Sequence, residues 1–115
     1  MTRLMLSLVL IAGPIATAHA DSDADIEIRA LIQAVAESEC EFNRNGSLYS
    51  AETAAEHLEL KYSRGKRYAD SAEAFIERLA SKSSWSGEPY QMICDGETQS
   101  AGDWLTMRLE ALRSQ

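Results

Sequence analysis

Two cysteines constrain this chain more than any other feature of its sequence. Cys40 and Cys94 are the only cysteines, and both follow an N-terminal segment that is typical of an export signal. In an oxidising compartment each has one possible partner, so we expect a Cys40–Cys94 disulfide. Closing so long a loop reduces the conformational entropy of the unfolded chain, which should raise the free energy of unfolding by about 4 kcal/mol. The spacing is not C-x-x-C, which favours a structural bond over a redox pair.

The N-terminal segment has the three parts of a secretory signal peptide. Arg3 supplies the positive charge, an apolar run follows from Leu4 to Ile15, and Ala18-His19-Ala20 matches an A-x-A cleavage site. The apolar run is too short for a membrane span. We expect residues 1–20 to be a signal peptide and residues 21–115 to form a single domain. The mature protein would be periplasmic or secreted, without stable membrane insertion.

The charge balance argues against polyanionic partners. Removing the leader leaves ten basic against 18 acidic residues, a net charge of −8. Nucleic acids and anionic membranes are bound through Lys and Arg, so we expect no nucleic-acid partner. A basic protein of the cell envelope is one partner that an acidic chain suits. The alternative is that the acidic residues serve solubility alone.

Apolar residues recur at helical spacing in four segments, which predicts four helices. The first covers about residues 23–38. Ser50 would cap the second, which Gly65 would end in the left-handed conformation. Asp70 or Ser71 would cap the third, and Ser100 the last. The apolar faces are Ile28, Leu31, Ile32 and Val35; Ala51, Ala55, Leu58 and Tyr62; Ala72, Phe75, Ile76 and Leu79; and Trp104, Leu105, Leu109 and Leu112.

Shorter segments alternate with a period of two and predict strands. Cys40 and Phe42 would face inward, Asn45-Gly46 is a strong hairpin turn, and Leu48 would continue the inward pattern beyond it. A later strand would carry Tyr90, Met92 and Cys94 inward. The predicted fold class is therefore α+β: a small antiparallel sheet, made of a hairpin plus one later strand, covered by about four helices and joined by one disulfide.

One surface is a candidate binding site for an anion or a sugar. His57 and Lys61 are four residues apart on one helical face, and hydroxyls and amides of the serine-rich loop 81–86 could complete the site. The alternative is that these bases offset acidic charge and the loop is merely a tight turn. The candidate residues are His57, Lys61, Ser83, Ser84, Trp85, Ser86 and Tyr90. The further basic residues expected to face the loop are Arg64, Lys66, Arg67, Arg78 and Lys82.

Trp85 has two interpretations of its own. An aromatic side chain in a polar loop either anchors a partner or carbohydrate, or folds back onto the core. The sequence does not decide between them.

The sequence contains no complete catalytic or metal-binding set. Ser63-Arg64-Gly65-Lys66 matches S-x-x-K but lacks the companion motifs. His57 is the only histidine after the leader and both cysteines are expected to be oxidised, so we expect no metal and no cofactor. We therefore expect a non-catalytic binding or interaction module of the cell envelope. The alternative is a small hydrolase or transferase acting on envelope polymers, with His57 and a serine of the loop.

Many residues of the mature chain resemble those of one known family. The order and spacing of these residues are similar to the YfeK-like family of small periplasmic proteins. The resemblance implies a secreted bacterial envelope protein, in a family without an assigned activity. Some members lack both cysteines, which implies that the disulfide reinforces the fold rather than being a condition for it. The residues concerned are Phe42, Asn45-Gly46, Tyr49, Ala54, His57-Leu58, Lys61, Ala72-Glu73, Phe75-Ile76-Glu77, Ala80-Ser81, Ser83-Ser84, Ser86-Gly87, Pro89-Tyr90 and Trp104-Leu105.

Overall fold

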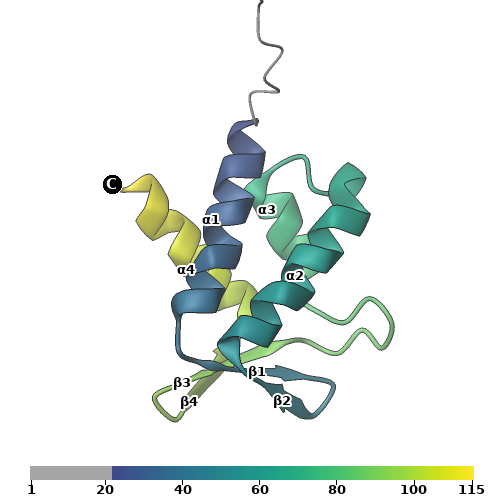
Figure 1. Cartoon of the computed structure of the whole chain (residues 1–115), viewed down its shortest axis with the longest axis vertical. Coiled ribbons are helices and arrows are strands. Elements are labelled where there is room, and N and C mark those ends of the chain that lie inside the picture. Colours follow the sequence, from purple (N-terminus) through teal and green to yellow (C-terminus); the bar gives the residue numbers. More distant parts are fainter. Residues whose placement is uncertain (1–21) are drawn as a thin grey trace, which may run out of the picture.

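The helices lie on one side of a four-stranded antiparallel sheet (Figure 1). The computed structural model describes residues 22–115, so the predicted signal peptide and its cleavage site lie outside the described residues. Within that range no helix is long and apolar enough to cross a membrane. The elements are α1 (Asp23–Glu37), β1 (Glu41–Arg44), β2 (Ser47–Tyr49), α2 (Ala51–Gly65), a 3-10 turn (Lys66–Tyr68), α3 (Ala72–Phe75), a π-helical turn (Ile76–Ala80), β3 (Gln91–Cys94), β4 (Glu97–Ser100) and α4 (Ala101–Arg113).

Serine hydroxyls start the helices α1 to α4. Ser22, Ser50, Ser71 and Ser100 each accept a hydrogen bond from the backbone N–H three residues further on, at 3.0 to 3.2 Å. These bonds satisfy amide groups that have no partner inside the helix. The predicted apolar faces are buried, except that Trp104 and Leu112 are partly buried. Local capping and apolar spacing therefore account for where the helices begin and which side faces the core.

Gly65 ends α2 for a different reason from the predicted one. Its φ is −116°, so the expected left-handed cap is wrong, and the chain continues directly into the 3-10 turn. A Cβ atom at position 65 would lie 2.9 Å from Cδ2 of Leu79. The missing side chain thus lets the end of α2 approach the π-helical turn that follows α3.

The sheet has one strand more than predicted. Its order is β2-β1-β3-β4, and both outer strands belong to two-residue hairpins. The turns Asn45-Gly46 and Asp95-Gly96 have positive φ at both positions, the geometry that matches the twist of the flanking strands. The prediction of an α+β fold with a disulfide is confirmed, with β4 as an additional edge strand.

The first hairpin orients its second strand differently from our expectation. Arg44 pairs with Ser47, so Phe42 pairs with Tyr49 and Asn43 with Leu48. Paired residues share a face of the sheet, which puts Tyr49 on the inner face and Leu48 on the outer. Leu48 is 55% exposed, and its predicted inward orientation is wrong.

The disulfide extends the pairing between the two central strands. Glu41 pairs with Ile93 in the antiparallel β1–β3 ladder, and Cys40 and Cys94 occupy the next position. Their Cα atoms are 4.5 Å apart, as in a non-hydrogen-bonded antiparallel pair. The predicted bond is confirmed, and it joins residues 54 positions apart in the sequence.

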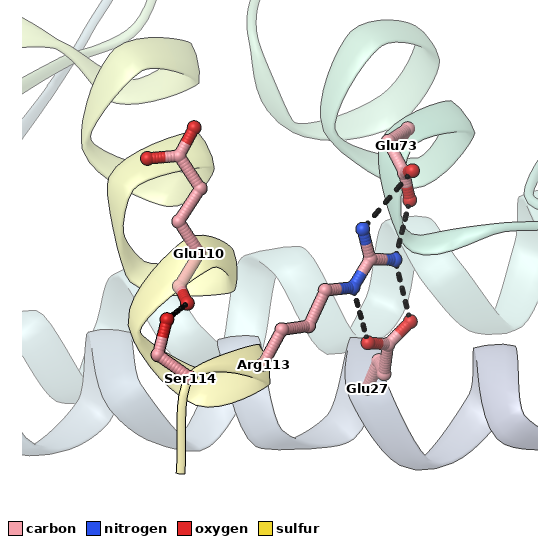
Figure 2. Close-up of polar contacts among 5 residues, drawn as sticks. All are labelled: Glu27, Glu73, Glu110, Arg113 and Ser114. Atoms are coloured by element: carbon pink, nitrogen blue, oxygen red, sulfur yellow. Dashed lines mark hydrogen bonds and ion pairs between the residues drawn. The ribbon is translucent and has the colours of Figure 1, made fainter.

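A charged cluster ties the end of α4 to two other helices (Figure 2). The Arg113 guanidinium donates to both carboxylate oxygens of Glu27 in α1, at 2.7 and 2.9 Å, and to both oxygens of Glu73 in α3, at 2.8 and 3.2 Å. These hydrogen bonds lower the pKa of Glu27 and of Glu73. The bidentate geometry makes the pairing more specific than most surface ion pairs.

Replacing both cysteines tests the contribution of the disulfide. We expect the double variant Cys40→Ala/Cys94→Ala to remain folded and to lose about 4 kcal/mol of unfolding free energy, because its unfolded chain regains the freedom of a long loop. Urea denaturation followed by circular dichroism measures this difference. Wild-type protein kept reduced is the control and should show the same loss. A loss below about 1 kcal/mol would contradict the expected contribution.

Candidate functional site

A hollow with a volume of about 490 Å³ lies between the first hairpin, α2 and the loop 81–89. Its size is within the range of small-molecule sites. Of the seven candidate residues, the structure brings six to its lining, and the exception is Ser86. The six are His57, Lys61, Ser83, Ser84, Trp85 and Tyr90. Their spatial proximity is observed, whereas their role in binding stays a prediction.

One face of α2 supplies the helical part of the hollow. His57, Lys61 and Arg64 follow each other at spacings of four and three residues, so they project on the same side of the helix. The adjacent stripe, including Leu58 and Tyr62, is buried in the core. The helix therefore holds its polar groups beside a packed apolar face.

Tyr90 lies at the centre of the polar contacts and is only 2% exposed. Its hydroxyl accepts a hydrogen bond from Nζ of Lys61 at 3.1 Å and lies 3.2 Å from Nε2 of His57. Its ring packs against Phe42, with centroids 5.0 Å apart, and Lys61 Nζ lies 4.9 Å from the ring centroid. The same lysine also donates to the Lys82 carbonyl at 3.1 Å. Among the described residues, Lys61 is thus held in position by these groups and by no carboxylate.

Arg44 is a residue of the hollow that we did not predict. Its Nη1 lies 2.9 Å from Nδ1 and 3.3 Å from Nε2 of His57, and its Nη2 donates to the Tyr49 hydroxyl at 3.3 Å. The alternation that points Cys40 and Phe42 inward also places Arg44 on the inner face, so the sequence did contain this signal.

The contacts of His57 define its chemical state. A guanidinium can only donate, so the His57 ring accepts the hydrogen bond from Arg44, whose Nη1 lies near both ring nitrogens. Burial, followed by the charges of Arg44 and Lys61, lowers the pKa of His57 to about 4. The imidazole is therefore neutral at neutral pH.

The hollow concentrates positive charge in an acidic chain. Arg44, Lys61 and Arg64 line it, whereas no described Asp or Glu does. The ion pairs within residues 22–115 involve Arg29 and Arg113 and none of these three cations. Burial, and secondarily the charge of Arg44, lowers the pKa of Lys61 to about 8. Burial raises the pKa of Tyr90.

The serine-rich loop is tied to the first hairpin. Oγ of the buried Ser83 accepts from the backbone N–H groups of Trp85 and Ser86 and from the Asn45 side-chain amide, at 3.2 to 3.4 Å. The Ser86 hydroxyl donates to Oδ1 of Asn45 at 2.5 Å. Ser83 and Ser86 therefore hold the loop, and Ser83 also lines the hollow together with Ser84 and Trp85. In the described part of the chain, no serine hydroxyl is hydrogen-bonded to His57.

The two interpretations of Trp85 can now be separated. Its side chain is 96% exposed, so the expectation that it folds back onto the core is wrong. Tyr68, which is 47% exposed, is a second aromatic residue that lines the hollow. Two exposed aromatic side chains therefore border the group of cations.

The remaining basic residues of the predicted surface do not line the hollow. Lys66 lies over the ring of Tyr62 and Arg67 over the ring of Tyr68, while Arg78 donates to the Tyr68 carbonyl. Lys82 contributes its carbonyl rather than its ammonium group. The described residues include no group of three or more His, Cys, Asp or Glu side chains placed to hold a metal.

Titration of His57 tests the electrostatics of the hollow. We expect an imidazole pKa of about 4, measured by NMR, and a higher value in Arg44→Gln because a neighbouring positive charge is removed. The unfolded chain, with an ordinary pKa of about 6.5, takes up the proton first. The associated stability is therefore complete above pH 6.5 and is lost as the pH falls towards 4. The variant His57→Gln assigns the signal, and an unchanged pKa in Arg44→Gln would contradict this account.

Comparisons with known proteins agree with the resemblance seen in the sequence. The chain is 37% identical over 76 residues to the uncharacterized protein YfeK of Salmonella typhimurium (strain LT2), a match that covers 65% of this chain and 63% of that protein. The matched region is thus less than two thirds of the relative's own length. No solved structure matches the chain. The model of a family of unknown function, DUF5329, matches residues 22–113, and the chain belongs to this family.

Proposed function

We propose that the protein is a non-catalytic binding module whose ligand is a small anion or carries an anionic group. The observation that supports this most directly is the hollow in which Arg44, Lys61 and Arg64 meet without a carboxylate among the lining residues. Hydrogen bonds between these cations and an anion would be charge-assisted and stronger than neutral ones.

The electrostatics of the hollow support an anionic ligand. Burial, and secondarily the nearby charge of Arg44, disfavours the charged form of Lys61, as its lowered pKa indicates. An anion between them would replace repulsion by attraction. Because the groups are already held by Tyr90, Tyr49 and the Lys82 carbonyl, little ordering would be needed on binding.

We further propose that the protein works in the periplasm or another oxidising space outside the cytoplasm. The Cys40–Cys94 disulfide supports this location, since such bonds persist where thiols are not kept reduced. The signal-peptide pattern of residues 1–20 points the same way.

The contacts of His57 favour binding over hydrolysis. A serine hydrolase needs a base within hydrogen-bond reach of its nucleophile, but His57 accepts from Arg44 and contacts Tyr90 instead. Ser83, the buried serine of the loop, receives backbone amides. The hydrolase or transferase alternative therefore lacks its nucleophile and base pair among the described residues. A basic protein partner stays a prediction that no described contact favours.

Removing single charges tests the proposed anion site. We expect citrate, titrated at low ionic strength by calorimetry, to bind the wild-type chain, and Lys61→Gln or Arg44→Gln to weaken it about tenfold or more, because each removes a hydrogen bond to a charged group. Arg108→Gln, which removes an equal charge from α4, is the matched control and should bind like the wild type. Equal affinities of Lys61→Gln and Arg108→Gln would contradict the proposal.

The pH dependence offers a second check of the same site. Citrate affinity should fall as the pH rises above about 8, because Lys61 loses its proton there. Bound citrate favours the charged lysine, so the fall should shift to higher pH as citrate is added. Calorimetry between pH 7 and 10 measures this trend, and Lys61→Gln should lack it. A trend that persists in Lys61→Gln would assign the titration to another group.

A further inference from the structure

The side chain of Trp85 is an exposed apolar surface at the border of a charged hollow. It is 96% exposed, although indole rings in folded proteins are mostly covered. It lines the same hollow as Arg44, Lys61 and Arg64. Single exposed hydrophobic residues need no explanation, but one placed beside the cations of the hollow forms an amphipathic surface.

The backbone that carries Trp85 is held firmly. The amide of Trp85 donates to Ser83 Oγ, and the turn is closed by Gly87 N–H donating to the Ser83 carbonyl at 2.9 Å. Ser83 N–H donates to the Glu88 carbonyl at 2.9 Å, and Gly87 has a φ of +76°, which glycine adopts readily. The loop thus presents the ring without burying it, and a ligand would not have to order the backbone.

The groups around the hollow match one kind of molecule. Trp85 and Tyr68 provide aromatic faces, the hydroxyl of Ser84 provides a hydrogen-bonding group, and the cations require a negative charge. A carboxylated sugar has all three complementary parts. Its C–H groups pack on the negative face of an aromatic ring, its hydroxyls take hydrogen bonds, and its carboxylate pairs with Arg or Lys.

We propose that the hollow binds an anionic sugar, such as a uronic acid unit, with its ring on Trp85 and its carboxylate among Arg44, Lys61 and Arg64. This inference rests on the proposed anion-binding function and names the ligand class of that site. The volume of about 490 Å³ is that of a small-molecule site, so it suits a single sugar unit better than a long polymer. Contact with Trp85 would then favour ligands that have a sugar ring, and the cations would favour those that carry a carboxylate.

NMR titration of the full chain with four probes tests the proposal. The probes are glucuronate, its neutral counterpart glucose, citrate as an anion without a ring, and benzoate as an aromatic anion. We expect glucuronate to shift the indole N–H signal of Trp85, assigned with Trp85→Ala, and to bind at least tenfold more tightly than glucose. Glucuronate should also bind more tightly than benzoate.

Two variants separate the ring from the charge. Trp85→Ala should weaken glucuronate about three- to tenfold, as expected for the loss of an aromatic contact, and leave citrate affinity unchanged. Lys61→Gln should weaken both. Met107→Ala, which truncates another exposed apolar side chain, is the matched control and should change neither. Because Trp85 is exposed, its variant should keep the wild-type melting temperature.

The possible failures are distinguishable. If neither citrate nor glucuronate binds, the proposed anion-binding function is wrong, and the sugar with it. A second result would be that citrate binds through Lys61 but glucuronate binds no more tightly than glucose, or that Trp85→Ala leaves glucuronate affinity unchanged. The anion site would then be supported and the sugar proposal contradicted. Tighter binding of benzoate than of glucuronate would overturn the sugar in favour of an aromatic anion.

Discussion

The antiparallel register between β1 and β3 is the constraint on which the rest of the structure depends. Phe42 pairs with Met92, which buries both side chains, and the disulfide lies two positions further along the same face. Continued by two positions in the other direction, this register sets Arg44 opposite Tyr90. A slip by one residue would turn each of these side chains to the outer face. The disulfide and the hollow therefore lie at opposite ends of the β1–β3 pairing. A bond that fixes the register at Cys40 and Cys94 also fixes which face of the sheet carries Arg44.

The hollow shows how a small fold holds like charges together. Arg44 comes from the sheet and Lys61 from α2, and the neutral ring of His57 lies against Arg44 as a hydrogen-bond acceptor. Burial lowers the pKa of His57, and the charges of Arg44 and Lys61 lower it further, because a protonated imidazole would add a third positive charge. In this arrangement His57 contacts both the guanidinium and the Tyr90 hydroxyl. The glycine at position 65 contributes indirectly, because it lets α2 pack closely against the segment that carries Leu79 at the edge of the hollow.

Local signals in the sequence were sufficient for the helices, while the sheet needed tertiary information. Ser50 and Ser100 could be identified as caps because their bonds reach only three residues. The strand β4 was missed because Glu97-Thr98-Gln99-Ser100 contains no apolar residue, although Asp95-Gly96 signalled a turn. Leu48 was assigned to the wrong face because register follows from pairing across the turn rather than from hydrophobicity.

In the candidate site, too, local signals identified some residues, whereas others depended on tertiary contacts. His57 and Lys61 could be paired from helical spacing, and the serine-rich loop could be recognised from composition. That Ser83 accepts backbone amides could not be read from the sequence, since Ser83 and Ser84 are adjacent serines in one loop. Arg44 could have been found, because the alternation that buries Phe42 extends to it. The outward orientation of Trp85 depends on how the loop is anchored to Asn45, a contact across 38 to 41 residues.

The acidic surface and the basic hollow act on a ligand at different distances, and together they restrict the kinds of anion that suit the proposed site. The whole chain has a net charge of −7, which repels a polyanion along its length. At physiological salt this repulsion is screened beyond about 8 Å, so a small anion that enters the hollow interacts mainly with the cations lining it. A long polyanion would still bring many of its charges close to acidic side chains. If the hollow binds an anion as proposed, the chain would discriminate by size as well as by sign, which favours a single charged unit, or the charged end of a polymer, over nucleic acid.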